Sequence, residues 1–493
     1  MNFVPVQTKA EVPRQSAGKW LVLAALMAAQ FMIVIDLAGV NVALPSIQRD
    51  LRFSETSLQW VSGIYQLIFG SFLLLGGRIA DRQGRSRMFR IGVILFSGAS
   101  LLCGLAWSSG SLLAFRGVQG MAAALLSPTA LSTVMRLFPE GRDRHIALGV
   151  WGAVFGAGGA LGSLFGGIIT SAWGWNWFFF LNVPLGLYAL LAGARLLPRD
   201  VPGEAKGKFD APGAIAVSAG TIVLLYGLTT APNAGWTAPV TLASFAAAAL
   251  LLASFVRIQA RSPSPLIPKP LIRMPTLRAG LGIGVWIGVC HFSMFFVLTQ
   301  YMQNVLGLTA IQTAGGYMAA AALTILFANL TSRLVKPFGV KSILIAGQIC
   351  VTLAFAYFSR LPADGHYAVD LLPALLVCGI GWGLLFPSVN LLSFTGLEKM
   401  NTGIASGLVN MSEQFGGAAG TTVSAVVAAA WAGASASSSS AAGLLADGSS
   451  LASGFRAAFL MLTGLSIVCL VLTALFVRPP RSANAQAMPK MSH

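Results

Sequence analysis

Long runs of apolar residues, separated by short polar segments, fill most of the chain. A run of about 18 or more apolar residues is long enough to cross the hydrocarbon core of a bilayer as one helix. By this measure the pattern predicts fourteen membrane-spanning helices. They are expected at residues 20–44, 58–77, 91–108, 111–135, 146–170, 177–197, 212–231, 238–257, 279–302, 313–334, 341–360, 370–395, 403–431 and 453–477.

Two polar linkers, residues 197–210 and 257–278, divide these spans into groups of six, two and six. The second linker carries five prolines, which block a continuous helix, so we expect it to form an extended strap. Near the end of the chain, residues 428–450 are rich in Ala, Ser and Gly, and we expect a mobile loop there. The predicted organisation is a tail (1–19), a six-helix half (20–197), linkers with an inserted helix pair (198–278), a second six-helix half (279–477) and a tail (478–493).

Composition agrees with a membrane protein. Of the 493 residues, 56% are hydrophobic and only 10% are charged, whereas roughly a quarter of the residues in soluble domains are charged. The net charge of +17 would suggest nucleic acid in a soluble protein. Here 27 of the 32 Lys and Arg residues fall in segments that the positive-inside rule places in the cytoplasm. The basic charge therefore indicates topology and affinity for anionic lipid, with both termini in the cytoplasm, and no nucleic-acid partner is expected.

The sequence lacks the common motifs of nucleotide-binding proteins, zinc proteases and serine hydrolases. There is no phosphate-binding Walker loop, no HExxH zinc motif and no nucleophile elbow. The five cysteines lie in apolar runs without a CxxC pair or a cysteine-histidine cluster, which argues against disulfides and structural zinc. The first apolar run is too long for a signal peptide, so we interpret it as a retained spanning helix. We therefore expect no enzyme and no cofactor, and any transport work must be driven by an ion gradient.

Only two carboxylates, Asp36 and Glu413, lie well inside predicted spans. Placing a charge at mid-bilayer costs about 2.5–3.5 kcal/mol even on lenient insertion scales, so each requires a reason. One reason is a packing role, in which a nearby donor satisfies the carboxylate. The other is a functional role, in which the group faces a water-filled cavity and binds a proton or a cation. Glu413 shares one helical face with small and polar residues, which are Ser406, Asn410, Gly417 and Gly420.

Two further polar residues lie inside spans. Arg116 is the single in-span arginine, with Gln119 one turn later, and it either neutralises a carboxylate or holds the two halves in register. His291 is a lone intramembrane histidine, and such a residue is more often a satisfied interior group than a proton relay.

The fifth predicted span is rich in glycine. Gly158, Gly162 and Gly166 recur every four residues, and Gly149, Gly152, Gly156 and Gly159 form an adjoining face. Small residues at this spacing let helix backbones approach closely, either as a static packing face or as a sliding seam. Aromatic residues in the spans expected to line a cavity are more often packing residues than ligand contacts; they are Tyr65, Trp286, Phe295, Phe296, Tyr301, Trp382 and Phe386.

The segment 77–90, GRIADRQGRSRMFR, places five arginines and one aspartate between two predicted spans. Gly77 and Gly84 allow a tight hairpin, and Asp81 can accept hydrogen bonds from guanidinium groups or lie at a helix N-terminus. Charge alone favours an ordinary cytoplasmic loop. The spacing G-x-x-x-D-R-x-G-R, however, resembles the signature between the second and third helices of major facilitator superfamily transporters.

The whole chain, from Asp36 to about Gly420, resembles the fourteen-helix drug:proton antiporters of that superfamily, the EmrB/QacA-type multidrug exporters. The segments that carry the resemblance are DLAGVNVALP, LQWVSGIYQL, RGVQG, GGALGSLFGG, WNWFFFLNVPLG, FDAPG, YMQNVLGLTAIQTAG and GIASGLVNMSEQFGG. Ser163 stands where the antiporter signature usually has proline. The resemblance implies an all-α integral membrane protein of the cytoplasmic membrane with the major facilitator fold, two six-helix halves plus an inserted pair.

The resemblance further implies alternating access driven by a proton gradient, with Asp36, Glu413 and Arg116 in proton coupling. It places the cytoplasmic gate at Gly77, Asp81, Arg82, Gly84 and Arg85, and the antiporter-motif helix at Gly158, Gly162, Gly166 and Gly167. We expect the substrate cavity to include Asn41, Tyr65, Gln119, Phe296, Tyr301, Phe386, Asn390 and Asn410.

The expected substrates are small amphipathic or drug-like compounds, and the expected transporter is a monomer. An exporter of one metabolite or siderophore is the alternative within this fold. A membrane enzyme or sensor is the alternative outside it, which the absence of a nucleophile set or soluble domain disfavours. A periplasmic adaptor protein is left open as a partner.

Overall fold

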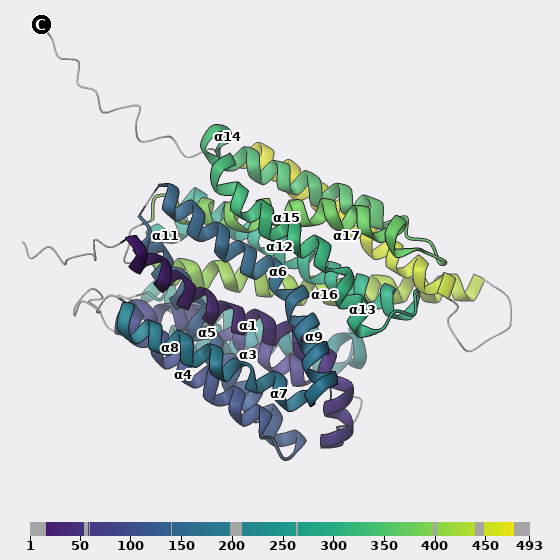
Figure 1. Cartoon of the computed structure of the whole chain (residues 1–493), viewed down its shortest axis with the longest axis horizontal. Helices are drawn as coiled ribbons and strands as arrows, with labels where there is room; N and C mark the ends of the chain where they lie inside the picture. The colour runs from purple at the N-terminus through teal and green to yellow at the C-terminus, as the bar shows by residue number, and fades with distance from the viewer. Residues whose placement is uncertain are drawn as a thin grey trace, which may run out of the picture.

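The computed structural model describes residues 16–53, 58, 60–139, 141–197, 210–262, 265–397, 402–438 and 448–477. Every regular element in these ranges is a helix, and the long helices run roughly along one common direction (Figure 1). Helices are expected here because a chain in a bilayer must satisfy its backbone hydrogen bonds within each segment.

The helices pack into two groups and a separate pair. The first group contains α1 (Ser16–Leu51), α3 (Trp60–Gln83), α4 (Arg85–Gly104), α5 (Ser109–Leu137), α6 (Arg142–Trp173), α7 (Trp175–Phe180) and α8 (Asn182–Leu196). The pair consists of α9 (Ala211–Ala234) and α10 (Pro239–Arg261). The second group contains α12 (Pro275–Asn304), α13 (Ala310–Gly316), α14 (Met318–Phe358), the π-helix Tyr367–Leu371, α15 (Leu372–Phe394), α16 (Thr402–Ser438) and α17 (Gly448–Phe476). We refer to the first and second groups as the two halves.

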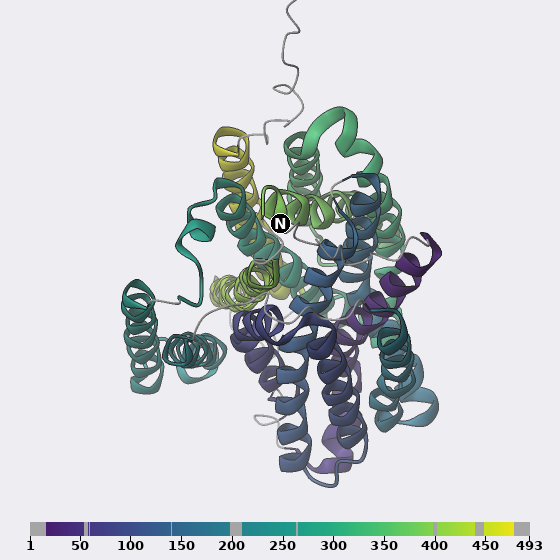
Figure 2. The same ribbon diagram turned by 90° about the vertical axis from the view of Figure 1, so that its left-hand side faces the viewer.

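The two halves meet along two seams. On one side α6 packs against α14 and α15, and on the other α3 packs against α16. The pair α9 and α10 stands at one side of the bundle, with α9 against α3 and α16 (Figure 2). These helices therefore form the contact between the two halves.

Eleven segments in the described ranges are long and apolar enough to cross a membrane. One of them, Ile311–Phe358, contains a break at Gly339, where φ of 78° interrupts the helix, and two shorter apolar stretches lie at Leu161–Trp173 and Pro212–Leu228. The predicted number of fourteen stays a prediction, since it requires the broken segment to be counted twice and the shorter stretches once each. The protein is a multi-pass membrane protein.

Two expectations about linkers are wrong. The second linker is not one extended strap: α10 continues to Arg261, α11 (Lys269–Arg273) forms within it, and α12 begins at Pro275. Its prolines allow this because a proline is tolerated in the first turn of a helix, where its missing N–H has no partner anyway. The loop expected from Ala428 is also wrong at its start, since α16 continues to Ser438; residues 439–447 lie outside the described residues. The linker 198–209 and both tails (1–15 and 478–493) also lie outside them.

Candidate functional site

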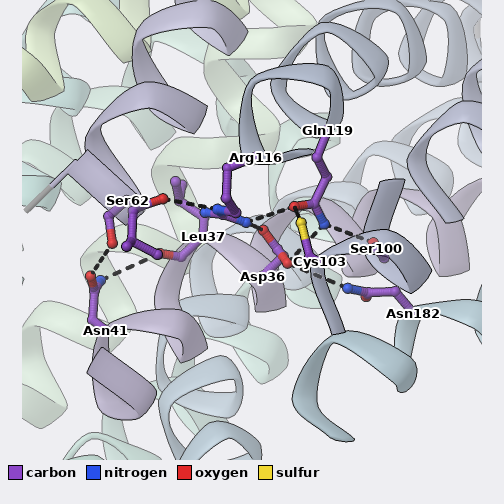
Figure 3. Close-up of polar contacts among 10 residues, drawn as sticks. Asp36, Leu37, Asn41, Ser62, Ser100, Cys103, Arg116, Gln119 and Asn182 are labelled. Atoms are coloured by element: carbon purple, nitrogen blue, oxygen red, sulfur yellow. Dashed lines mark hydrogen bonds and ion pairs between the residues drawn. The ribbon is translucent and has the colours of Figure 1, made fainter. Parts of the chain in front are cut away.

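Asp36 of α1 and Arg116 of α5 form an ion pair in the interior of the first half (Figure 3). Both side chains are 0% exposed. Arg116 Nη1 donates to Asp36 Oδ2 in a short contact, and Arg116 Nε donates to the Val61 carbonyl at 2.9 Å. The guanidinium carbon lies 4.4 Å from the centre of the Tyr65 ring, a cation–π distance. The single in-span arginine thus neutralises a carboxylate of its own half.

Gln119 extends this pair into a network. Its Nε2 donates to Asp36 Oδ1 at 3.0 Å and to Ser100 Oγ at 2.7 Å, while its Oε1 accepts from Arg116 Nη1 at 2.8 Å. Asn182 Nδ2 donates to the same Asp36 oxygen at 3.4 Å. A buried ion pair is tolerated when additional hydrogen bonds satisfy the remaining donors and acceptors, and these residues supply several of them.

The network is not fully satisfied. Among the described residues, Arg116 Nη2 and the Tyr65 hydroxyl are buried without a hydrogen-bond partner. Unsatisfied buried polar groups are rare and call for an explanation. Both groups are available to a ligand or a water molecule that enters the site.

Glu413 of α16 has a different environment. It is 4% exposed, and no hydrogen bond or ion pair joins its carboxylate to any described residue. It lines a small, tightly closed cavity together with residues from both halves, which are Trp151, Phe155, Phe386, Asn390 and Asn410. The second in-span carboxylate is therefore unpaired and faces a space between the halves.

Aromatic rings surround His291 beside this cavity. The ring centres of Phe295, Trp382 and Phe386 lie 5.0, 5.0 and 5.2 Å from that of His291. The ring of Phe155 from the first half lies tilted against that of Phe386, with the ring centres 5.1 Å apart. His291 Nδ1 has no hydrogen-bond partner among the described residues. The second half therefore has a cluster of aromatic rings beside the cavity, with one polar side chain, His291, among them.

The structure brings together some of the predicted cavity residues and separates others. Tyr65 and Gln119 join the Asp36 network, and Phe386, Asn390 and Asn410 line the Glu413 cavity. Asn41 is exposed and accepts a hydrogen bond from Ser62 at 2.7 Å (Figure 3). Tyr301 donates to the Pro362 carbonyl at 2.7 Å, and Phe296 is 37% exposed; neither lines the cavity.

Asp81 of α3 caps the N-terminus of α16 across the boundary between the halves. It accepts from the backbone N–H groups of Gly403 at 3.1 Å and Ile404 at 3.0 Å, and from Arg85 Nη2 at 2.7 Å. A carboxylate is favoured at this position because the N-terminus of a helix carries partial positive charge. Arg82 is exposed and Gly84, with φ of 99°, forms the turn between α3 and α4.

Close backbone approach completes this contact. A Cβ on Gly77 would clash with the Gly403 carbonyl, so only glycine lets α3 and α16 meet here. Ser406 Oγ donates to the Pro128 carbonyl of α5 at 2.9 Å. We call this end of the bundle, where α3 and α5 meet the start of α16, the Asp81 end. The halves are joined at the Asp81 end.

The two glycine faces of α6 meet different partners. A Cβ on Gly162 would lie 2.8 Å from the Ile35 carbonyl and one on Gly166 2.6 Å from the Gly39 carbonyl, both in α1 of the same half. A Cβ on Gly149 would lie 2.7 Å from the Ala328 carbonyl, and one on Gly152 2.9 Å from Pro387, both in the other half. Gly158 packs with the first face on Val34, and Gly167 lies against Ile311 of α13.

Sequence reasoning missed Asn182, Trp151 and Phe155. Asn182 is a polar residue in an otherwise apolar run, the same signal that identified Gln119. Trp151 and Phe155 are four residues apart on α6, where the repeated glycines are the stronger sequence signal. No group of three metal-binding side chains occurs within the described ranges.

Comparison with known proteins gives the family. The model of the Major Facilitator Superfamily matches residues 26–421. The chain is 35% identical over 429 residues to the puromycin resistance protein pur8 of Streptomyces alboniger, covering 86% of this chain and 84% of that protein. It is 36% identical over 399 residues to the cephamycin export protein CmcT of Amycolatopsis lactamdurans, with 80% and 82% covered.

Multidrug resistance protein Stp of Mycobacterium tuberculosis is 31% identical over 401 residues, with 81% of this chain and 74% of that protein covered. The crystal structure of the human organic anion transporter MFSD10 superposes with a TM-score of 0.64 at 13% identity, covering 94% of this chain and 100% of that one, which shows a shared fold. The chain belongs to the Major Facilitator Superfamily and is a membrane transporter, not an enzyme, related to antibiotic and multidrug exporters.

Proposed function

We propose that this transporter exports small amphipathic compounds from the cytoplasm, driven by protons that move inward through Asp36 and Glu413. The observation that carries the proposal is the contrast between the two carboxylates. Asp36 is held in an ion pair within the first half, whereas Glu413 is unpaired and lines a cavity made by both halves. Two buried carboxylates in different environments can be protonated at different points of one cycle.

In this proposal, protonation of Asp36 is coupled to the change of conformation. A proton on Asp36 removes the negative charge that holds Arg116, so the guanidinium is free to change its contacts with Gln119 and Val61. Arg116 also lies over the ring of Tyr65, so a movement of Arg116 changes this contact with α3. The same helix carries Asp81. Protonation can therefore change the balance between two states of the transporter by its differential affinity for them.

Glu413 supplies the exchange between substrate and proton. The cavity is closed in this structure; when the halves move apart, the Glu413 carboxylate and the aromatic rings beside it can contact an apolar molecule that carries a positive charge or a hydrogen-bond donor. Substrate loading from one side and protonation from the other then compete for the same group. This competition couples export to the proton gradient.

The Asp81 end is proposed to be the cytoplasmic gate, closed in this structure. The excess of arginine in residues 77–90 supports its cytoplasmic location, with both termini on the same side. The hydrogen bonds from Gly403 and Ile404 to Asp81 support its closure. Opening toward the cytoplasm requires α16 to leave Asp81.

Export of a single compound is the second candidate. Two relatives of high coverage are named for one antibiotic each, puromycin and cephamycin, which favours a narrow substrate range. A monomer is proposed because one chain supplies both halves and the space between them. A periplasmic adaptor is left open as a partner.

Purified protein in liposomes with an imposed pH gradient tests the proposal without other proteins. A panel should contain puromycin, a cephamycin, and several lipophilic cations and neutral amphipaths. Accumulation of several chemically distinct compounds supports the multidrug function, and accumulation of one supports the narrow exporter. If no compound accumulates, a requirement for an adaptor is tested by efflux from intact cells. Failure in both would contradict the exporter function.

A further inference from the structure

The second linker (residues 257–278) connects the end of α10 to the start of α12. Both helices are long and apolar enough to cross a membrane. Figure 1 shows α11, the short helix within the linker, at the end of the bundle where α1 begins. The linker therefore lies at a membrane surface, where lipid headgroups are its neighbours.

Every charged residue of this linker is basic. All of them are exposed, and none forms an ion pair with an acidic residue in the described part of the chain. Like charges close together repel one another, so the cluster is stabilised by anions that the described chain does not supply. The five cations are Arg257, Arg261, Lys269, Arg273 and Arg278.

Gln259 fixes the linker against the end of α10. Its side chain is buried, its Nε2 donates to the Ile267 carbonyl in a short contact, and its Oε1 accepts from the Leu266 N–H at 3.0 Å. Leu266 is 0% exposed and Leu271 of α11 is 2% exposed, so both belong to the apolar core. The linker thus has a defined path, in contrast to an ordinary polar loop.

The same bonds bring the cations of α10 and α11 together. Arg257 and Arg261 lie one turn apart at the end of α10, on either side of Gln259 in the sequence. Lys269 follows Ile267 by two residues. Two residues span at most about 7 Å, so Lys269 stays close to the end of α10.

Helix α11 carries the rest of the cluster. Lys269 and Arg273 lie one turn apart on it, and Arg278 Nε donates to the Ile272 carbonyl at 2.7 Å, which holds the guanidinium beside α11. Apolar side chains remain exposed near these charges: Ile272 is 42% and Val256 64% exposed. The surface therefore offers cations to a headgroup and apolar atoms to acyl chains.

We propose that the second linker is a binding site for an anionic phospholipid, whose phosphate is held among the five cations while its acyl chains lie along the exposed side of α10. Clusters of four to eight Lys and Arg residues next to a membrane span attract anionic headgroups, and each cation adds to the attraction. The fixed path of the linker makes this a defined site. This lipid partner goes beyond the proposed export function and does not depend on it.

Native mass spectrometry of the purified full-length protein measures the binding. Phosphatidylglycerol and phosphatidylcholine with the same acyl chains are added separately, and we expect at least about tenfold tighter binding of the anionic lipid. Lys269→Gln with Arg273→Gln removes two exposed cations and should weaken phosphatidylglycerol binding about thirtyfold, and Lys269→Gln alone about fivefold. Equal binding of the two lipids, or an unchanged affinity in these variants, would overturn the inference.

Arg142→Gln with Arg195→Gln is the matched control, because it removes two exposed cations from α6 and α8 in the first half. It should change phosphatidylglycerol binding less than about twofold, since salt screens charges outside the site. An equal loss in the control and in the α11 variant would show a diffuse attraction to the whole basic surface and would overturn the defined site.

Gln259→Leu separates charge from geometry, because it keeps all five cations and removes both bonds that hold the linker. It should weaken phosphatidylglycerol binding several-fold, whereas a diffuse charge effect would leave the affinity unchanged and contradict the proposal. The melting temperature of each variant reports folding, and the exposed Lys269→Gln provides the test if Gln259→Leu unfolds. Inorganic phosphate in excess should leave the lipid bound; displacement by phosphate alone would mean a simple anion site and would overturn the assignment to a lipid.

Discussion

The carboxylate of Asp81 accepts a hydrogen bond from the backbone N–H of Gly403 at 3.1 Å, and this bond joins the two halves of the transporter. Asp81→Asn keeps the shape but cannot accept from Gly403, Ile404 and Arg85 with full charge. Opening of the Asp81 end can be measured by labelling Ser406→Cys, a buried position in this end, with a membrane-impermeant maleimide. Because bonds to a charged group contribute about 1.5–3 kcal/mol, we expect this labelling to rise about tenfold or more and efflux to slow. The exposed Gln83→Ala is the matched control. Normal efflux by Asp81→Asn at equal expression would return residues 77–90 to the role of an ordinary cytoplasmic loop.

The Asp36–Arg116 pair predicts non-additive effects on stability. Either Asp36→Asn or Arg116→Gln alone leaves part of a buried network unpaired, and breaking such a pair costs about 3–5 kcal/mol. The double variant removes both charges, so its melting temperature in detergent should lie above that of at least the Asp36→Asn variant, in which Arg116 stays charged. Additive losses in the double variant would mean that the two residues do not act as a pair.

For Glu413→Gln we expect a large effect on transport and little effect on stability. Glu413 has no ion pair within the described chain, so the amide should leave the melting temperature nearly unchanged, within about 0.5 kcal/mol of stability. Transport should nevertheless lose its dependence on the pH gradient. A large loss of stability would reveal a packing role for Glu413 instead.

The two faces of α6 predict separable defects. Gly162→Ala pushes a Cβ toward the Ile35 carbonyl within one half and should lower stability, whereas Gly149→Ala pushes one toward Ala328 of the other half and should hinder closure. We expect a lower melting temperature for the first and faster labelling at Ser406→Cys for the second. Identical behaviour of both variants would contradict this division of roles.

Membrane orientation is tested by two exposed positions. Gln83→Cys, at the end of α3, should be labelled from the cytoplasm, and Thr237→Cys, between α9 and α10, from outside. An impermeant maleimide applied to whole cells and to inverted vesicles distinguishes the faces. Labelling of both positions from the same side would contradict the proposed topology.

Sequence reasoning identified Asp36 and Arg116 because a charged residue in an apolar run is conspicuous. It could not identify their pairing. Asp36 and Arg116 are 80 residues apart, and Asp81 and Gly403 are 322 apart, so no helical period relates them. The sequence therefore allows Arg116 either to neutralise a carboxylate or to hold the two halves in register. Only the packing shows that it neutralises Asp36 of its own half.

Periodicity likewise finds the faces of a helix but not their partners. The glycines of α6 predicted close packing, yet which face meets α1 and which meets the other half depends on the tertiary arrangement. The start of α12 shows the limit of local rules: a proline is expected to interrupt a helix, but Pro275 occupies the first turn, where proline is accommodated.

Uptake into liposomes by the double variant Asp36→Asn with Glu413→Gln, with only a pH gradient supplied, tests the central claim most directly. The unmodified protein should concentrate a substrate against its gradient, and the double variant should only equilibrate it, because neither coupling carboxylate can exchange a proton. Retained binding of an uncharged substrate shows that the variant is folded. Uphill accumulation by the double variant, at a rate comparable to that of the unmodified protein, would contradict the assignment of proton coupling to these two residues.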